Sequence, residues 1–304
     1  MRDFLSIADL SADELVNLLE RSAKIKADPQ SVATALAGTA VAMLFEKPST
    51  RTRTSFEVAV GQMAGIAVIL TETDMQLGRG ESLEDTGRVL SRYAEAIVLR
   101  TFGQDRLDRL AGAADAPVVS ALSDLEHPCQ AVGDLLTITE RKGALAGLTL
   151  AYLGDGNNTC HALMLAGALS GMRIRVACPP GYEPDERVSA LAAELAAAHG
   201  GAIEVTDDPA AGPAGADIVY TDVWASMGQE SEATAREAVF PPFQVNAAAM
   251  ALAAPDAIAM HCLPAHRGLE ITDEVLDGPQ SVVWDQAENR LHTEKAILLF
   301  ALDR

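Results

Sequence analysis

The segment from Phe45 to Glu57, FEKPSTRTRTSFE, constrains the fold more than any other stretch of this chain. The apolar run before it, TAVAMLF at residues 39–45, predicts a buried strand. Phe56, Val60 and Met63 then follow at helical spacing and predict a helix. A helix that begins directly after a strand offers unpaired backbone N–H groups and the positive end of its dipole, so this turn is a candidate anion site.

The side chains of this turn favour a phosphate-like anion. They combine two guanidinium groups with four hydroxyls at one strand-to-helix junction: Ser49, Thr50, Arg51, Thr52, Arg53 and Thr54. Guanidinium groups bind phosphate oxygens in pairs, and hydroxyls add further donors. The alternative is a polar helix start whose two arginines are simply solvated. The density of donors at a single turn favours the anion pocket.

Length and composition narrow the class of protein. With 304 residues, of which 49% are hydrophobic, the chain is expected to form two domains of about 150 residues each. The formal net charge of −20 argues against nucleic acid and anionic membranes as partners. Four cysteines without a C-x-x-C pair signal neither a metal site nor a disulfide framework. No signal peptide or membrane span is recognisable, so we expect a cytoplasmic protein.

Strands and helices alternate along the whole chain, which predicts an α/β fold of two doubly wound domains, each with a central parallel sheet flanked by helices. A composition break at residues 143–147, GALAG, separates a first domain at residues 1–142 from a second at residues 147–287. A short strand is expected around Trp284. A terminal helix is expected within residues 288–304.

In the first half, three residues suited to binding an anion lie where predicted strands end. Arg51 follows the strand at residues 39–45, Arg100 ends the strand at residues 96–100, and His127 follows the strand at residues 117–121. Ligands bind at the carboxyl ends of the strands of an open parallel sheet. We therefore expect these three side chains to converge.

The second half contains a partial dinucleotide fingerprint. Gly154 and Gly156 match its first two glycines, but Thr159 stands where the third belongs. The next strand ends in Cys178 and Pro179, without the acidic residue that a ribose requires. The turn is thus Rossmann-like, and no nicotinamide cofactor is expected.

Two further candidates end strands in the second half. Asp222 follows the strand at residues 217–221, and Cys262 lies in HCLP after the strand at residues 257–260. The acidic segment that follows Asp222, with its glycine and prolines, is expected to form a mobile lid. A buried structural cysteine is the alternative for Cys262, and a functional one needs a hydrogen-bonding partner such as Asp222 or Asn158.

Taken together, FEKPSTRTRTSFE, HPCQ, DVWASMG and HCLP resemble the carbamoyltransferase family in order and spacing, over essentially the whole chain. The last two motifs resemble members that act on ornithine, since those that act on aspartate carry different residues there. The resemblance implies transfer of a carbamoyl group from carbamoyl phosphate to the δ-amine of L-ornithine, giving L-citrulline and phosphate. It also implies a homotrimer with shared active sites, and a terminal helix, within residues 288–304, that packs back on the first domain. Because carbamoyl phosphate is a reactive mixed anhydride, no metal, cofactor or covalent nucleophile is expected.

The resemblance also implies a role for each matched residue. The expected carbamoyl phosphate ligands are Ser49, Thr50, Arg51, Thr52, Arg100, His127, Gln130 and Arg290, with Gln76 reaching a neighbouring subunit's site. The expected ornithine ligands are Asn158, Asp222, Ser226, Met227, Cys262 and Leu263. Among all of these, Arg100, His127, Asp222 and Cys262 are the expected catalytic residues.

Three alternatives stay open at this point. A carbamoyltransferase for putrescine or another amine would share the anion site and HCLP, and residues 226–228 (SMG) would tell the two apart. A non-catalytic relative would have lost Arg51, Arg100, His127 or Cys262, and all four are present. A nicotinamide-dependent dehydrogenase is disfavoured by the broken glycine fingerprint.

Overall fold

The computed structural model describes residues 1–77, 80–226 and 228–304. The chain divides into two compact units: unit 1 combines Met1–Leu136 with Glu288–Arg304, and unit 2 is Thr137–Ala287. The division falls inside two helices, α5 (Pro128–Lys142) and α11 (Val283–Ala301), which each contribute residues to both units.

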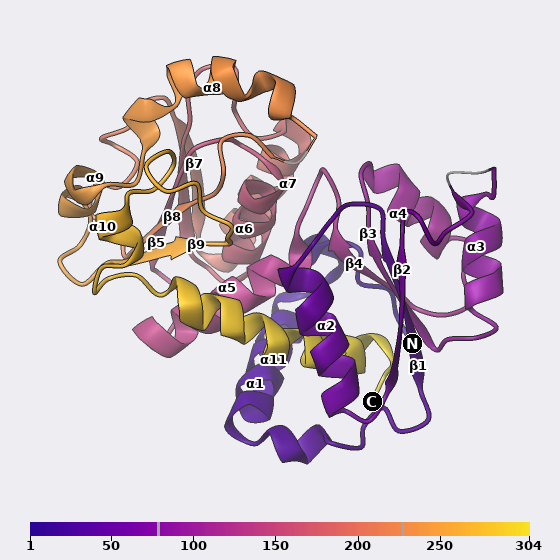
Figure 1. The fold of residues 1–304 in the computed structure, drawn as a ribbon. Coiled ribbons are helices and arrows are strands. Elements are labelled where there is room, and N and C mark those ends of the chain that lie inside the picture. Colours follow the sequence, from indigo (N-terminus) through magenta and orange to yellow (C-terminus); the bar gives the residue numbers. More distant parts are fainter. Residues whose placement is uncertain (78–79, 227) are drawn as a thin grey trace. The chain divides into compact units, whose positions relative to one another are not determined.

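The described part of unit 1 contains a parallel sheet of four strands in the order β2-β1-β3-β4. The strands are β1 (Ala40–Phe45), β2 (Ile66–Thr71), β3 (Ala96–Arg100) and β4 (Val118–Leu122). The helices are α1 (Ala12–Ala27), α2 (Arg51–Gln62), α3 (Leu83–Leu90), α4 (Gln104–Ala111) and the parts of α5 and α11 named above. Helices α3 and α4 lie on one side of this sheet, and α1 and α2 on the other (Figure 1).

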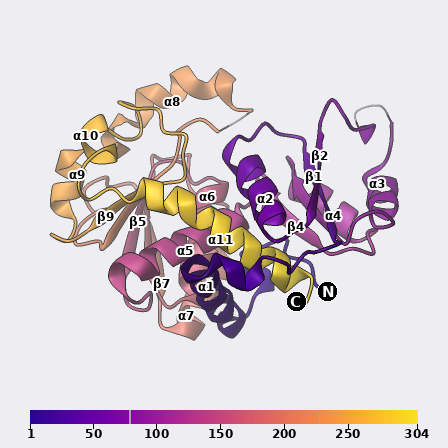
Figure 2. The same cartoon turned by 60° about the horizontal axis from the view of Figure 1, so that its bottom comes forward.

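Burial in unit 1 follows the strand period. On one face, Ala42, Leu44, Ile97 and Leu99 pack with apolar side chains from α3 and α4. A buried parallel sheet needs apolar side chains on both faces, and β1, β3 and β4 are buried almost throughout. The two chain ends meet at this unit, where the Arg2 N–H donates to the Ala301 carbonyl at 3.0 Å (Figure 2).

The described part of unit 2 contains a parallel sheet of five strands in the order β7-β6-β5-β8-β9. The strands are β5 (Thr149–Leu153), β6 (Arg173–Ala177), β7 (Ala202–Thr206), β8 (Ile218–Thr221) and β9 (Ile258–His261). The helices are α6 (Asn158–Leu169), α7 (Glu186–His199), α8 (Ala233–Val239), α9 (Ala247–Leu252) and α10 (Asp273–Leu276). Helices α6 and α7 lie on one side of this sheet, and α9 and α10 on the other (Figure 1).

The sheet order of unit 2 explains why its strand ends gather. The chain moves outward from β5 to β6 and β7, then crosses back so that β8 pairs with the other side of β5. Such a switch point opens a crevice at the carboxyl ends of the strands. The chain segments after β5, β8 and β9 therefore leave the sheet next to one another.

Two of the expected elements differ in the structure. Trp284 is not in a strand: Ser281 makes a single bridge to Ala259, and α11 begins at Val283. The apolar run SVVW is too short to override the helix-forming residues after it, and Trp284 is left 60% exposed in the first helical turn. The expected lid after Asp222 contains a helix, α8, in addition to loops.

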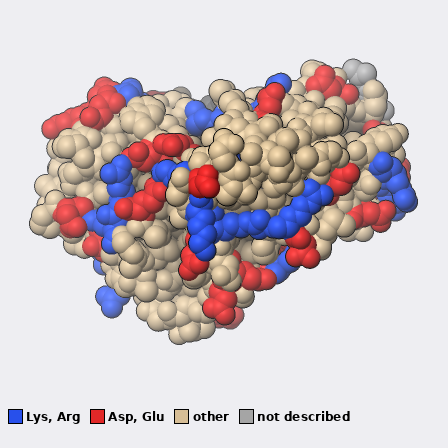
Figure 3. Space-filling view, turned by 90° about the horizontal axis from the view of Figure 1, so that it is seen from below, with Lys and Arg blue, Asp and Glu red and all other residues tan. Residues whose placement is uncertain are grey.

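No helix in the described ranges is both long and apolar enough to span a membrane. Acidic and basic side chains are interspersed on the face shown in Figure 3, so the excess of acidic residues does not make this surface uniformly negative. A locally positive site is compatible with the overall charge of −20 for that reason.

Candidate active site

The strand-to-helix turn after β1 has the predicted form. Thr50 is the residue before α2 and its side chain makes no capping hydrogen bond. Ser49 caps the helix instead, because its Oγ accepts a hydrogen bond from the Thr52 N–H at 3.2 Å. Arg51 begins the helix and is half-buried, whereas Thr52 is buried. The first turn of α2 therefore presents backbone N–H groups beside a guanidinium group.

Strand pairing places Arg100 and His127 near this turn. Phe45, the last residue of β1, pairs with Arg100, the last residue of β3, and β3 pairs in turn with β4. Arg100 and His127 are both 6% exposed. Burial, followed by the charges of Arg290 and Arg100, holds the pKa of His127 well below its ordinary value. Its imidazole is therefore neutral at physiological pH, and in the described chain its Nδ1 is buried without a hydrogen-bond partner.

Arg290 ties together residues that are far apart in the sequence. Its Nη1 donates to Gln130 Oε1 at 2.9 Å, and its Nη2 donates to Thr52 Oγ1 at 2.9 Å. The side chain is 4% exposed and projects from α11. The predicted residues Thr52, Gln130 and Arg290 thus form one hydrogen-bonded group, which also lies in the electrostatic reach of His127.

Two carboxylates that the sequence reasoning missed orient this group. Glu294 Oε1 accepts from Arg290 Nη2 at 2.7 Å and from its Nε at 3.2 Å. Asp134 Oδ1 accepts from Gln130 Nε2 at 2.8 Å. Burial raises the pKa of the Glu294 carboxyl to about 7, although Arg290 opposes this shift. Both carboxylates stand four residues after their partner on a helix, a spacing that could have indicated them.

Gln76 is a predicted carbamoyl phosphate ligand that lies outside the hydrogen-bonded group of Thr52, Gln130 and Arg290. It lies in the loop after β2, the edge strand of the unit 1 sheet, and its side chain is exposed. Its carbonyl accepts a hydrogen bond from the Glu81 N–H at 3.3 Å. Among the described residues, the hydrogen bonds of Arg290 join it to Gln130, Thr52 and Glu294 and not to Gln76.

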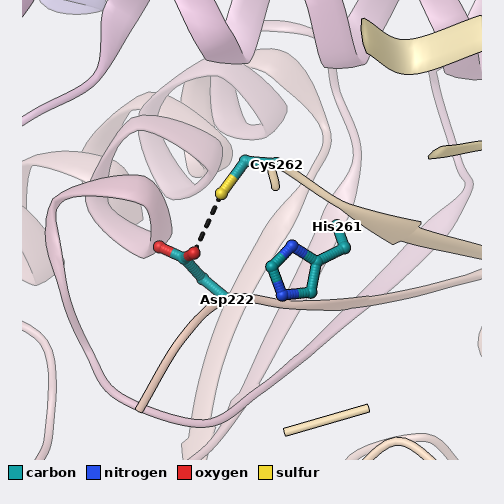
Figure 4. Close-up of side chains that lie close together, drawn as sticks. All are labelled: Asp222, His261 and Cys262. Carbon is teal, nitrogen blue, oxygen red and sulfur yellow. Dashed lines mark hydrogen bonds between the residues drawn. The ribbon is translucent and has the colours of Figure 1, made fainter. Parts of the chain in front are cut away.

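In unit 2, Asp222 and Cys262 are direct neighbours. Strand β8 pairs with β9 so that Thr221 lies opposite His261, and the next residue of each strand is Asp222 and Cys262. Cys262 Sγ donates to Asp222 Oδ1 at 2.9 Å (Figure 4). Asp222 is 6% exposed, so a carboxylate and a thiol meet at a largely buried point.

The neighbour of the predicted Asn158 holds Asp222. Asn157 Nδ2 donates to Asp222 Oδ2 at 2.9 Å. Its Oδ1 meanwhile caps α6 by accepting from the Thr159 and Cys160 N–H groups. Asn158 is the first residue of α6 and is half-buried. An asparagine before an apolar helix is a typical cap, a signal that could have identified Asn157.

The remaining predicted ornithine ligands lie in two loops. Ser226 is half-buried, and its N–H donates to Gln229 Oε1 at 3.0 Å. Met227 lies outside the described residues. Leu263 is half-buried, has a positive φ of 57°, and donates its N–H to His261 Nδ1 at 2.8 Å.

Asp222, His261 and Cys262 offer one possible metal-ligand atom each, and in the described chain these atoms lie within 4.8 Å of one another. Both nitrogens of His261 already have partners, because Nδ1 accepts from Leu263 and Nε2 faces Glu270 Oε1 at 3.1 Å. A metal would have to break one of these bonds to bind the imidazole. The arrangement fits a hydrogen-bonded cluster better than a metal centre.

Comparison with known families finds a match in each half of the chain. Residues 2–140 match the family model described as the carbamoyl-P binding domain of aspartate/ornithine carbamoyltransferase. Residues 146–301 match the model of the Asp/Orn binding domain of the same family. Together the two models cover nearly the whole chain.

Individual relatives are similar over their full length. The ornithine carbamoyltransferase of Parafrankia sp. is 56% identical over 99% of this chain and 96% of that protein. The structure of ornithine carbamoyltransferase from Pyrococcus furiosus superposes with a TM-score of 0.95 at 50% identity, covering 98% of this chain and 96% of that one. That of the anabolic enzyme from Campylobacter jejuni superposes with a TM-score of 0.94 at 35% identity, covering 100% and 99%. The chain therefore belongs to the aspartate/ornithine carbamoyltransferase family.

Proposed function

We propose that this protein is an ornithine carbamoyltransferase. The δ-nitrogen of L-ornithine attacks the carbonyl carbon of carbamoyl phosphate, the bond from that carbon to the phosphate oxygen breaks, and L-citrulline and phosphate are released. Family membership and the names of relatives more than 50% identical support this reaction. Two relatives are named as anabolic enzymes, which supports the citrulline-forming direction.

Unit 1 is proposed to bind carbamoyl phosphate. The first turn of α2, with Ser49, Thr50 and Arg51, would hold the phosphate through N–H groups and charge. Arg100 and neutral His127 would donate to the carbonyl oxygen as it becomes negative. Removing one such donor typically slows an enzyme by about 10²- to 10³-fold. Thr52, Gln130 and Arg290 are already fixed to one another, so they require little reorganisation.

Unit 2 is proposed to bind ornithine. An alkyl amine has a pKa of about 10, so it must lose a proton before it can attack. Asp222 and Cys262 would position the δ-amine, and a phosphate oxygen would finally accept its proton. Asp222 and Asn158 would also engage the α-amino end. Ser226, Met227 and Leu263 are the remaining proposed contacts with the amino acid.

The hydrogen bond of 2.9 Å between Cys262 and Asp222 is the observation that carries the ornithine assignment. Aspartate as acceptor would bring a second carboxylate toward Asp222, which is largely buried. The pair instead suits a substrate whose side chain ends in an amine.

The test is the initial rate of ureido-product formation from carbamoyl phosphate with four acceptors in parallel: L-ornithine, putrescine, N-acetylornithine and L-aspartate. Turnover with L-ornithine alone supports the proposal. A preference for putrescine would be consistent with carbamoyl phosphate binding by unit 1, but it would refute the contacts with the amino acid proposed for Ser226 and Met227. No turnover with any acceptor would favour a non-catalytic relative.

A homotrimer in the cytoplasm completes the proposal. The edge strand β2 exposes Ile66 (59%) and Val68 (40%), and exposed apolar side chains on a sheet edge are suited to a subunit contact. Gln76 follows this strand and would reach a neighbouring subunit's carbamoyl phosphate. Light scattering of the purified protein tests the trimer, and Ile66→Lys is expected to reduce the molecular mass to that of a monomer.

A further inference from the structure

Glu270 and His261 form a buried pair that has no role in the reaction described above. Both side chains are 0% exposed. His261 is the last residue of β9 and directly precedes Cys262. Its Nε2 lies 3.1 Å from Glu270 Oε1, and Glu270 Oε1 also accepts the His266 N–H. Burying a carboxylate costs free energy unless hydrogen bonds or a charged partner offset it. We therefore asked what the Glu270–His261 pair does for the residues next to it.

The loop that this pair supports is strained. Leu263 has a φ of 57°, in the left-handed region that residues with a Cβ adopt only at a cost in free energy. The conformation is held by its N–H, which donates to His261 Nδ1 at 2.8 Å. This backbone conformation determines the positions of the Cys262 and Leu263 side chains after the end of β9.

The direction of that hydrogen bond determines the tautomer of His261. A backbone N–H can only donate, so Nδ1 must be the acceptor and must carry no proton. In a neutral imidazole the proton then lies on Nε2, which faces Glu270 Oε1. Glu270 is a hydrogen-bond acceptor at this position and therefore favours the one tautomer that can hold the Leu263 amide.

We propose that Glu270 is a positioning residue for the transfer reaction. It acts through His261, which it keeps in the Nε2–H tautomer. His261 in turn holds the Leu263 amide, so that Cys262 Sγ stays at 2.9 Å from Asp222. The kinetic part of this inference rests on the proposed function, whereas its structural part can be tested without activity.

The backbone around Glu270 is rigid enough for this role. The Glu270 carbonyl accepts from the Val245 N–H at 2.8 Å, and the next residue, Ile271, bridges to Val245. Val245 and Ile271 belong to the apolar core of unit 2 and are at most 1% exposed. A carboxylate anchored in this way can fix the imidazole within the tolerance that catalytic positioning requires.

The first experiment measures the reactivity of the Cys262 thiol. Cys129, Cys160 and Cys178 are buried and Cys262 is half-buried, so alkylation by iodoacetamide, located by mass spectrometry, reports on Cys262. We expect Glu270→Leu to raise this rate by about fivefold or more, because the loop then opens locally. Glu270→Gln retains an acceptor oxygen and is expected to match the wild type.

Asp217→Leu is the matched control. Asp217 also accepts a backbone N–H, that of Thr149 at 2.8 Å, but it precedes β8 and so lies at the opposite end of the sheet. This variant is expected to lose stability without changing the reactivity of Cys262. Equal alkylation rates in Glu270→Leu and Asp217→Leu would overturn the proposal.

Kinetics and NMR complete the test. Glu270→Leu is expected to lower kcat by about 100-fold, the effect of a displacement near 1 Å, with KM for carbamoyl phosphate unchanged. Nitrogen-15 spectra should show His261 protonated at Nε2 in the wild type and in Glu270→Gln, and a mixture of tautomers in Glu270→Leu. An unchanged tautomer in Glu270→Leu would refute the proposal even if the acceptor substrate proved to be another amine.

Two substitutions of His261 remain informative if Glu270→Leu does not fold. In His261→Asn the new side-chain oxygen reaches the position of Nδ1 and can accept the Leu263 N–H. In His261→Gln the new oxygen reaches the position of Nε2 and cannot accept it. His261→Asn is therefore expected to retain more activity and slower Cys262 alkylation than His261→Gln. The reverse order would contradict the proposed chain of contacts.

Discussion

Glu126 provides a quantitative test of the electrostatics next to the candidate active site. This residue precedes His127, is 2% exposed, and accepts hydrogen bonds of 2.6 Å from Ser6 Oγ and from the Ile7 N–H. Burial raises the pKa of its carboxyl from 4.5 to about 7, more than these two bonds lower it. The protonated acid fits the same site, because its O–H can donate to Ser6 Oγ while its carbonyl accepts from Ile7.

The sign of the effect follows from the raised pKa. The folded state binds the proton more tightly than the unfolded state, so the stability from this group is complete below pH 4.5 and is lost as pH rises through 7. Between pH 5 and pH 8 the loss amounts to about 2.5 kcal/mol of the free energy of unfolding. Glu126→Gln, which is neutral at every pH, should lack this loss.

The assay is urea unfolding of both proteins at pH 5, 6.5 and 8. Circular dichroism is the suitable probe, since Trp224 and Trp284 both lie in unit 2 and Glu126 lies in unit 1. As pH rises from 5 to 8, the free energy of unfolding of Glu126→Gln should increase relative to that of the wild type by about 2.5 kcal/mol. Identical pH dependence in the two proteins would show that Glu126 is ionised in the folded protein throughout this range, and would refute the reasoning.

Three further predictions concern the candidate active site. Arg290→Met should lower kcat/KM for carbamoyl phosphate by about 10²- to 10³-fold, since it leaves Thr52, Gln130 and buried Glu294 without their shared donor; a loss under threefold in steady-state rates would contradict this. Cys262→Ser keeps a donor to Asp222 and should retain more kcat than Cys262→Ala, and equal kcat values would argue against the thiol hydrogen bond. His127 should show no titration by NMR between about pH 5.5 and 8.5, because burial and two arginines lower its pKa, and a midpoint near 6.5 would contradict the neutral imidazole.

The sequence predicted most strands of the fold because buried parallel strands are short, apolar runs. The strand at residues 96–100 was predicted with the bounds that the structure has. The strands predicted at residues 39–45, 117–121, 217–221 and 257–260 were each correct to within one residue. The strand expected at Trp284 was wrong because local β-propensity in SVVW competes with a long helix that begins at Val283. The start of α6 at Asn158 depends on the cap by Asn157.

The grouping of site residues was predictable only where it follows from topology. The adjacency of Asp222 and Cys262 follows from strand ends in one sheet, and the structure places them at hydrogen-bond distance. The buried partner of His261 was not predictable in the same way. Glu270 meets His261 through a loop of nine residues, and no period in the sequence encodes that contact.

The two units hold their proposed ligand residues by different forces, and this determines which substitutions each can accept. In unit 1, Arg290 makes four hydrogen bonds to three side chains from one planar group. Lysine has the charge of arginine but not its planar set of donors. Arg290→Lys is therefore expected to lower kcat/KM about as much as Arg290→Met does.

In unit 2, Asp222 is instead held by short neutral donors, from Asn157, the Val223 N–H and Cys262. Among the described residues its hydrogen-bond partners carry no positive charge, so its position depends on hydrogen bonds near 2.9 Å. A substitution that changes the shape of Asn157 or Cys262 should therefore lower activity more than a substitution that changes a charge near Asp222. The proposed carbamoyl phosphate site is thus organised by the charge and donors of Arg290, and the proposed amine site by the hydrogen-bond geometry around Asp222.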